Sequence, residues 1–351
     1  MLGLALEFGT VPFDRPNVGM DSAMAYEDFV KLYAADVKSD PEKLLNEKPL
    51  SFPMSTLVRG EALIETVART VDIDLVGKRV LDVGCAYGGF SIAMAKAGAR
   101  VCGVDVSAKF IDYAKANALD TAEIEFSVLD ASSIDVRKTF EKGSFDFVLL
   151  NDVLEHIYDT ASLVANLDWL LNDTGMVFFK VPNGFSPRFV LSEGHRRIFG
   201  LTVLDPDCWF YLYPKRASIF YRPLSHFQAI FSHFGLPQTL LMDEERVFAR
   251  MTERKLKGQI KEIFAKARDL EHPDPVFKTY LRKGIQRFRN EFFYDAENST
   301  TEFVQYKYGS YFFTGFFARE NTKLKALTST RSIVGFGTIT DGASGEAAAA
   351  A

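Results

Sequence analysis

The sequence predicts an α/β protein built on a doubly wound, mainly parallel sheet of seven strands. Short runs rich in β-branched and apolar residues alternate with helix-like stretches from Lys78 to Asn183. A glycine-rich turn follows the first of these runs, and an acidic or amide side chain ends each of the next three. Strands that alternate with helices are joined by right-handed βαβ crossovers, so neighbouring strands are expected to run parallel.

The predicted elements follow in order along the chain. Helical pieces in residues 1–75 form a lead-in to the sheet. The first five strands are expected at 79–83, 100–104, 123–129, 145–150 and 176–181. The helices between them are expected at 88–97, 108–118 and 154–171. A helix follows at 224–234, and two further strands at 238–242 and 311–318 complete the sheet. Two amphipathic helices within 246–291 lie before the last strand.

The chain has 351 residues, more than one ordinary domain needs. We expect a helical lead-in over 1–75 and a main domain over 76–320. This domain carries two inserts, at 184–222 and 246–300, which are candidates for a lid or cap over a substrate. The polar segment 321–351 ends in five alanines and is expected to be disordered or artificial.

Composition narrows the classes of function. The chain has 41 Lys and Arg against 46 Asp and Glu, and a net charge of −5 disfavours nucleic acid as a partner. The three cysteines, Cys85, Cys102 and Cys208, show no metal-type spacing and fit a reducing compartment. We see neither a secretory leader nor an apolar run long enough to span a bilayer, and therefore expect a cytoplasmic protein.

One segment departs from this acidic balance. Residues 246–291 carry 13 Lys and Arg against 6 Asp and Glu. A solvated helical face is the simplest explanation. The alternatives are a cap that attracts a phosphate-bearing acceptor, such as a nucleotide- or lipid-linked sugar, and a peripheral contact with anionic lipid headgroups.

The strongest local signal is the turn after the first predicted strand, in which Gly84, Gly88 and Gly89 lead into a helix. Glycines allow a ligand to approach the backbone, and a helix N-terminus offers unpaired N–H groups. Asp105 ends the second predicted strand, where a carboxylate can bind both hydroxyls of a ribose. Asp130, Asn151 and Asp152 end the third and fourth, at the edge on which open α/β sheets bind ligands.

Two classes of ligand compete for this turn. A nicotinamide or flavin nucleotide is typically bound by Gly-x-Gly-x-x-Gly, but here Ala86 stands in place of the second glycine. Asp82 lies two residues before Gly84, and its carboxylate would oppose a pyrophosphate. The same carboxylate suits a ligand with a cationic ammonium or sulfonium group. Dinucleotide binding is therefore disfavoured.

These motifs resemble those of a known family. Asp82-Val-Gly-Cys-Ala-Tyr-Gly88, Asp105, Asp130 and Phe145-Asp-Phe-Val-Leu-Leu-Asn-Asp-Val-Leu-Glu-His156 are similar to the successive motifs of class I S-adenosylmethionine-dependent methyltransferases. The likeness is greatest to the branch of quinone and sugar O-methyltransferases, and the stretch 170–183 is similar to that branch's fifth strand. The resemblance covers about residues 76–183 and implies a Rossmann-like methyltransferase fold with S-adenosylmethionine as cofactor.

The resemblance also implies roles for matching residues in cofactor binding. It implies that Gly84, Ala86 and Gly88 pass beneath the methionine part of the cofactor and that Asp82 binds its ammonium group. Asp105 would bind the ribose hydroxyls, Asp130 and Ala131 would border the adenine, and Asn151 would lie beside the methionine part. Taken alone, Asp130 could equally cap a helix start.

Methyl transfer to an alcohol or phenol needs a general base within reach of the acceptor hydroxyl. His156, directly after the fourth-strand motif, and His195, in the first insert, are the candidate catalytic residues. His156 could instead bond a backbone carbonyl. We expect no metal site, since Pro182 and Asn183 stand where a catechol-type magnesium site would need an acidic pair. Ala217 and Ser218 stand where this branch often carries a histidine.

The sequence thus predicts an enzyme that methylates a small molecule or glycan from S-adenosylmethionine, most simply at oxygen. A non-catalytic, cofactor-binding partner subunit is the alternative from another class. A nicotinamide-dependent oxidoreductase is a third, disfavoured by Asp82 and Ala86.

Overall fold

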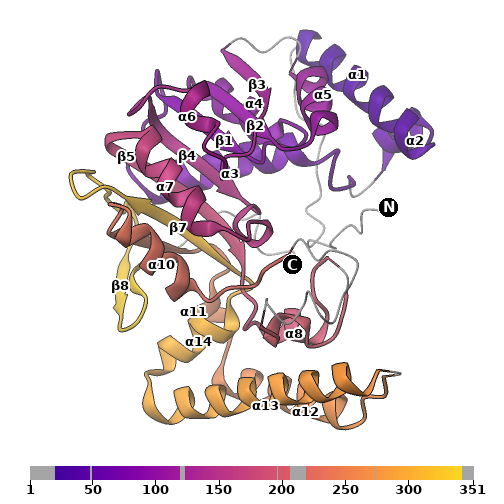
Figure 1. Ribbon diagram of the computed structural model, residues 1–351, viewed down its shortest axis with the longest axis vertical. Coiled ribbons are helices and arrows are strands. Elements are labelled where there is room, and N and C mark those ends of the chain that lie inside the picture. The colour runs from indigo at the N-terminus through magenta and orange to yellow at the C-terminus, as the bar shows by residue number, and fades with distance from the viewer. Residues whose placement is uncertain are drawn as a thin grey trace.

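The computed structural model describes residues 20–47, 50–118, 123–195, 197–205, 219–272 and 274–341. In this part of the chain nine strands form one sheet in the order β3-β2-β1-β4-β5-β7-β6-β9-β8 (Figure 1). The predicted α/β, doubly wound fold class is confirmed, but the sheet has nine strands and not seven.

The first five strands are parallel neighbours, and each of them was expected from the sequence. They are β1 (Arg79–Val83), β2 (Arg100–Asp105), β3 (Ile124–Val128), β4 (Phe145–Asn151) and β5 (Leu171–Pro182). Strand β7 (Phe312–Ala318) inserts antiparallel between β5 and β6 (Gln238–Asp243).

The two additional strands come from the segment expected to be disordered, and that expectation is wrong for its first part. Strand β9 (Gly337–Asp341) pairs parallel with β6, and β8 (Thr330–Ile333) pairs antiparallel with β9. The segment is polar but rich in β-branched Thr and Ile, which favour strands. Ile339 is fully buried against the main core, while most of its neighbours face outward, as an edge pair allows. Residues 342–351 lie outside the described residues.

Alternate residues of the central strands face two separate cores, as a doubly wound sheet requires. One face packs against α7 (Thr160–Leu170) and α10 (Leu224–His233), and the other against α3 (Thr56–Thr70) and α4 (Gly89–Lys96). The long helix expected at 154–171 is shorter: a 3-10 turn, η1 (Leu154–His156), precedes α7. The short helix α6 (Val136–Thr139) follows β3.

The lead-in is packed tightly onto the sheet domain. A Cβ at Gly89 of α4 would lie 2.4 Å from the Leu57 backbone nitrogen of α3, so the two helices meet backbone to backbone. Helix α1 (Met20–Val37) packs on α5 (Ala108–Asn117) through Phe29, Tyr33 and Tyr113, and α2 (Pro41–Asn46) follows it. Residues of α3 and of the segment just before it thereby reach the edge of the sheet where β1 and β4 end.

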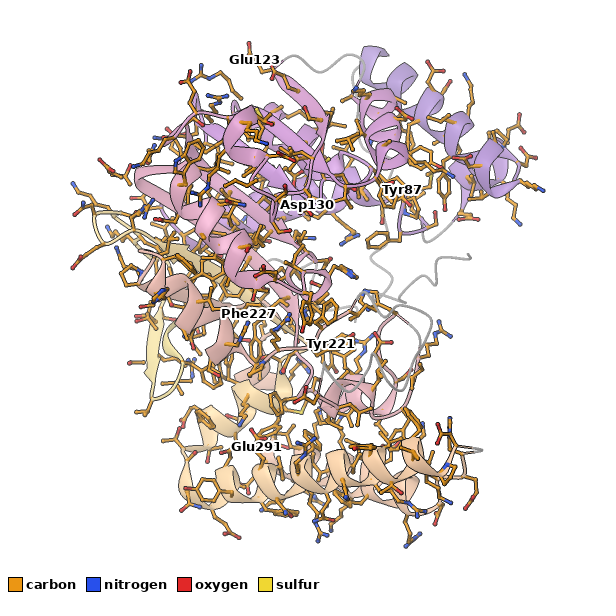
Figure 2. All side chains as sticks on the ribbon, in the orientation of Figure 1. Tyr87, Glu123, Asp130, Tyr221, Phe227 and Glu291 are labelled. Atoms are coloured by element: carbon orange, nitrogen blue, oxygen red, sulfur yellow. The ribbon has the colours of Figure 1, made fainter. Side chains whose placement is uncertain are left out.

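The helical insertion has a hydrophobic core of its own. It contains α11 (Val247–Arg250), α12 (Glu253–Arg268), α13 (Pro275–Asn298) and α14 (Thr301–Gly309), with α12 and α13 forming the lower layer in Figure 1. Helix α8 (Pro187–Leu191) and the 3-10 turn η2 (Leu201–Val203) share this core. Tyr221 belongs to the same core and lies between the sheet and this layer (Figure 2). None of the helices in the described part of the chain is long and apolar enough to cross a membrane.

Candidate functional site

A pocket of about 410 Å³ lies at the C-terminal ends of β1, β2 and β4. All residues expected at the site line it, except Gly88. We refer to its two sides as the strand-end half and the histidine half. The strand-end half consists of Asp82, Gly84, Ala86, Asp105, Asp130, Ala131 and Asn151, and the histidine half of Glu155, His156, Phe189, His195, Tyr221 and Phe312.

The turn after β1 is held in a conformation that only certain residues tolerate. Gly84 has φ +68°, and a Cβ there would lie 2.8 Å from Val153 Cγ2. Ala86 adopts φ +45°, which is uncommon for a residue with a side chain and often marks a functional turn. Gly88 has φ +75°, and its Cβ would approach Ala114 of α5 to 3.0 Å. Gly88 is not among the residues that line the pocket, and the close approach of Ala114 favours glycine at this position.

Asp82 is a buried carboxylate at the end of β1, with 3% of its surface exposed. Its Oδ2 accepts a hydrogen bond of 2.6 Å from the Ser91 hydroxyl of α4. Burial raises the pKa of Asp82 to about 7, and the Ser91 hydrogen bond opposes that rise. A cationic group in the pocket would stabilise the charged form.

Asp105 ends β2 and connects two loops through its carboxylate. Its Oδ2 accepts from the Ala86 backbone N–H at 3.1 Å, and its Oδ1 accepts from the Ser107 N–H at 2.8 Å. Burial raises the pKa of Asp105, while these two hydrogen bonds lower it. Each oxygen keeps a further lone pair for a ligand donor.

Asp130 and Ala131 follow β3. Asp130 Oδ1 accepts from the backbone N–H of Ser132 at 2.8 Å and from its hydroxyl at 2.6 Å, so one oxygen supports the local turn. Ala131 is buried, and its carbonyl accepts from Asn166 Nδ2 at 3.0 Å. Both residues nevertheless line the pocket.

Asn151 ends β4, and Asp152, which follows it, connects the sheet to the lead-in. Asn151 Nδ2 donates to Asp152 Oδ2 at 3.1 Å, and Arg59 of α3 forms an ion pair with the same oxygen at 3.3 Å. Asp152 adopts φ +57°. Arg59 is the one Lys or Arg among the described residues that line the pocket.

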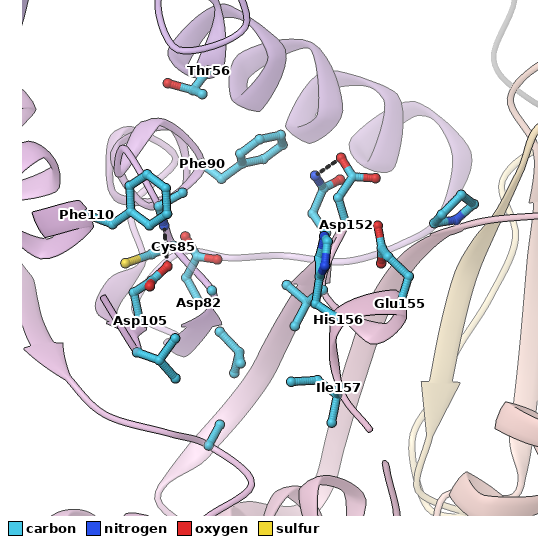
Figure 3. Close-up of a pocket in the computed structure, with 18 of the residues that line it drawn as sticks. Thr56, Asp82, Cys85, Phe90, Asp105, Phe110, Asp152, Glu155, His156 and Ile157 are labelled. Atoms are coloured by element: carbon cyan, nitrogen blue, oxygen red, sulfur yellow. Dashed lines mark hydrogen bonds between the residues drawn. The ribbon is translucent and has the colours of Figure 1, made fainter. Parts of the chain in front are cut away.

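The histidine half brings together side chains from two distant segments. His156 lies in η1 after β4, and His195 follows α8, yet their rings are 5.1 Å apart at an angle of 87°. Glu155, beside His156, is 1% exposed and lines the same pocket. Figure 3 shows Asp82 and Asp105 on one side of the pocket and Glu155 and His156 on the other. The two candidate catalytic histidines thus face one cavity with the strand-end residues.

A buried carboxylate positions His195. Glu193 has no exposed surface, and its Oε1 accepts from the His195 backbone N–H at 2.7 Å. The same oxygen lies 3.0 Å from His195 Nδ1 and accepts from the Tyr221 hydroxyl at 2.7 Å. A proton on Nδ1, shared with Glu193, leaves Nε2 of the neutral ring as its hydrogen-bond acceptor.

Arg59, Glu155 and Tyr221 line this pocket but were not expected there from the sequence, and neither was the support that Glu193 gives to His195. Asp152 and Glu155 lie in the same motif as His156, and this position in the sequence could have marked Glu155 as a site residue. Arg59 and Tyr221 reach the pocket through tertiary packing, Glu193 contacts His195 and Tyr221 in the same way, and no local pattern marks these three residues.

Comparison with known proteins places the chain in a family. A family model of a methyltransferase domain matches residues 57–237, just over half of the chain. A ubiquinone biosynthesis O-methyltransferase of Ralstonia nicotianae is 37% identical over 119 residues, which are 34% of this chain and 49% of that protein. The enzyme of the same name from Bordetella avium is 31% identical over 172 residues, 48% of this chain and 64% of the relative. The chain spans about half the length of most of the curated relatives described.

Solved structures show a more distant likeness. An S-adenosylmethionine-dependent methyltransferase from Mesorhizobium loti has a TM-score of 0.41 and 18% identity, covering 59% of this chain and 92% of the other. Haemonchus contortus phosphoethanolamine N-methyltransferase 2 has a TM-score of 0.39 and 20% identity, covering 74% and 51%. TM-scores this low are not evidence of function. The family match over residues 57–237 shows that the chain belongs to the methyltransferase domain family. The expected class I S-adenosylmethionine-dependent methyltransferase is thereby confirmed.

Proposed function

We propose that the protein transfers the methyl group of S-adenosylmethionine to a hydroxyl of a small molecule. One observation carries this proposal: the carboxylates at the ends of β1 and β2 and two histidines from distant segments line a single pocket. A cofactor held by the first group would present its methyl group to an acceptor beside the second.

The strand-end half and Arg59 of α3, which lines the same pocket, together offer a partner for each polar part of the cofactor. The Asp105 carboxylate suits the ribose hydroxyls, and buried Asp82 suits the ammonium. Arg59, not assigned from the sequence, suits the methionine carboxylate. Gly84 and Ala86 leave the backbone open beneath the ligand, Asn151 borders its methionine part, and Asp130 with Ala131 would border the adenine.

Methyl transfer from a sulfonium is an in-line displacement, so orientation supplies much of the rate. A lone pair of the acceptor oxygen forms the new O–C bond while the C–S bond breaks and its electron pair passes to sulfur. The acceptor hydroxyl must also lose its proton. His195 is positioned by Glu193 with Nε2 available, and His156 lies beside it, so these rings are the candidates for receiving that proton.

The walls of the histidine half favour an acceptor with a flat apolar body. Phe189 is buried and contacts Tyr221 and Phe312, with ring centroids 6.5 and 5.7 Å apart. Aromatic walls suit a phenolic ring, and they can also stack against a sugar. The ubiquinone biosynthesis relatives support a phenol, so we place a glycan, free or linked to a nucleotide or lipid, second. The helical insertion, whose core includes Tyr221, would then support the acceptor wall.

A direct assay tests the proposal. Purified protein is incubated with isotopically methyl-labelled S-adenosylmethionine and two acceptor panels, one of catechols and hydroquinones with and without prenyl chains, the other of free and nucleotide-linked sugars. We expect S-adenosylhomocysteine to form together with a labelled methyl ether in the phenol panel. Products only from sugars would replace the phenol with a glycan. Cofactor binding without turnover in both panels would favour a non-catalytic partner subunit.

A further inference from the structure

We infer that Glu155, His156 and His195 form a binding site for one divalent transition-metal ion such as Zn²⁺. Each side chain offers one donor atom, and the three atoms lie within 4.8 Å of one another. The inference rests on the proposed function only in its second part, which places the acceptor oxygen on the open side of the ion. Binding of the ion itself can be measured without any acceptor.

The donor set determines the class of ion. Two imidazole nitrogens and one carboxylate oxygen are the ligands of zinc and of other first-row metals, whereas Mg²⁺ and Ca²⁺ prefer oxygen donors alone. Zinc bonds of about 2.0–2.2 Å put pairs of donor atoms roughly 3–3.5 Å apart. Small rotations of the side chains would close the three donors around an ion. Three protein ligands leave one position open, as in catalytic zinc sites.

Glu155 supplies an independent indication of a missing cation. Its Oε2 is buried and has no hydrogen-bond partner among the residues that the structure describes. Leaving a buried carboxylate oxygen unsatisfied is costly. A cation bound at this oxygen would supply the missing partner and remove that cost.

Glu193 provides the support that a metal-binding histidine usually has. Such histidines donate their second ring N–H to a carboxylate or carbonyl, which fixes the tautomer and the ring orientation. The contact of 3.0 Å between His195 Nδ1 and Glu193 Oε1 has this geometry, and it leaves Nε2 for the ion. The Tyr221 hydroxyl donates to the same oxygen at 2.7 Å.

The sequence predicted no metal site because Pro182 and Asn183 stand after β5 where a magnesium site would need an acidic pair. The proposed site lies elsewhere, in η1 and in the segment after α8, and it gives the two histidines a different role. A bound ion would lower the pKa of an acceptor hydroxyl, which would lose its proton to solvent before its oxygen attacks the methyl carbon. His156 and His195 would then hold the ion instead of receiving the proton.

Cobalt titration tests the site directly. Protein without a histidine tag is stripped with a chelator, and Co²⁺ is added while the visible d–d absorption is recorded. We expect saturation at one ion per chain in the wild type. Affinity should fall at least about 100-fold in His195→Ala and Glu155→Gln, and about 10–100-fold in Glu193→Gln. His233→Ala, which removes an exposed histidine on α10, should bind as the wild type does.

S-adenosylhomocysteine binding shows whether each variant is folded. Absence of saturable absorption in the wild type, or equal cobalt affinity in folded His195→Ala, would overturn the site. Methyl transfer unchanged by complete removal of metal would overturn its role in the reaction and leave the proposed function intact. One bound ion per chain with no methyl product in any panel would support the site and contradict the proposed function.

Discussion

The two halves of the pocket are built in different ways. The strand-end half takes its polar side chains from consecutive turns of one parallel sheet, between Asp82 and Asn151. The histidine half combines η1, the segment after α8, Tyr221 and β7, and the core of the helical insertion supports it from behind. Sheet topology alone brings the first set together, whereas the second depends on packing between segments far apart in the chain.

The halves also differ in how their buried carboxylates are stabilised. Asp82 and Asp105 accept hydrogen bonds from Ser91, Ala86 and Ser107 before any ligand binds. Glu155 Oε2 has no such partner among the described residues. The strand-end carboxylates are therefore held in place in advance, whereas Glu155 in the histidine half keeps one buried oxygen without a partner among the described residues. Variants in each half should consequently separate cofactor affinity from turnover.

The largest effect is expected in the histidine half. His195→Ala should reduce turnover about 10²–10⁴-fold, because it removes either the proton acceptor or a metal ligand. Affinity for S-adenosylhomocysteine, measured by calorimetry, should stay that of the wild type. His233→Ala is the matched control and should leave turnover unchanged. An equal loss of cofactor affinity in His195→Ala would mean that the halves are not separable.

Gly84→Ala should give the next largest effect. The added Cβ meets Val153 Cγ2 at 2.8 Å in a left-handed backbone, so the free energy of unfolding should fall by about 2–4 kcal/mol. Gly77→Ala is the control, since Gly77 has φ +71° but no atom within 4 Å of its added Cβ. Its cost should be about 1–2 kcal/mol. Equal denaturation midpoints for the two variants would argue against a tight contact at Gly84.

Asp105→Ala tests the strand-end half by removing the carboxylate proposed to bind the ribose, which also accepts from the Ala86 and Ser107 N–H groups. Loss of hydrogen bonds to a ribose should weaken S-adenosylhomocysteine binding by about 1–3 kcal/mol. Asp112→Ala, which removes an exposed carboxylate on α5 outside the pocket, should have no effect. Affinity unchanged by Asp105→Ala in calorimetry would remove the ribose assignment.

The smallest effect is a dependence of cofactor affinity on pH. The pKa of Asp82 is raised to about 7, so acid below that value neutralises the carboxylate proposed to bind the ammonium. Affinity for S-adenosylhomocysteine should therefore rise roughly tenfold between about pH 5.5 and about pH 7. Asp82→Asn should bind more weakly and lose this dependence. A flat profile in the wild type would show that Asp82 does not control binding of the ammonium.

Local pattern was enough to predict the strand-end half. Asp105 and Asn151 are the last residues of their strands, and strand ends can be read from β-prone runs and their breakers. Gly88 shows the limit of this reasoning, because nothing local in the sequence indicates that a side chain at this position would meet Ala114 at 3.0 Å. Strand β9 was missed because it too depends on a tertiary contact: Ile339 is buried where β9 pairs with β6.

Of the histidine half, the sequence predicted only two individual residues and not their arrangement in one site. His156 and His195 were both candidates, but nothing local indicates that their rings lie 5.1 Å apart. Glu193 and Arg59 gain their importance from burial and from partners 28 and 93 positions away in the sequence. Such contacts depend on the packing of α3, α8 and the helical insertion.

Calorimetric titration of S-adenosylhomocysteine tests whether the strand-end half is a site for this cofactor. We expect one saturable site per chain in the wild type and in His195→Ala, clear weakening in Asp105→Ala, and no competition by NADH. Absence of binding to the wild type, equal affinity in Asp105→Ala, or displacement by NADH would contradict this assignment.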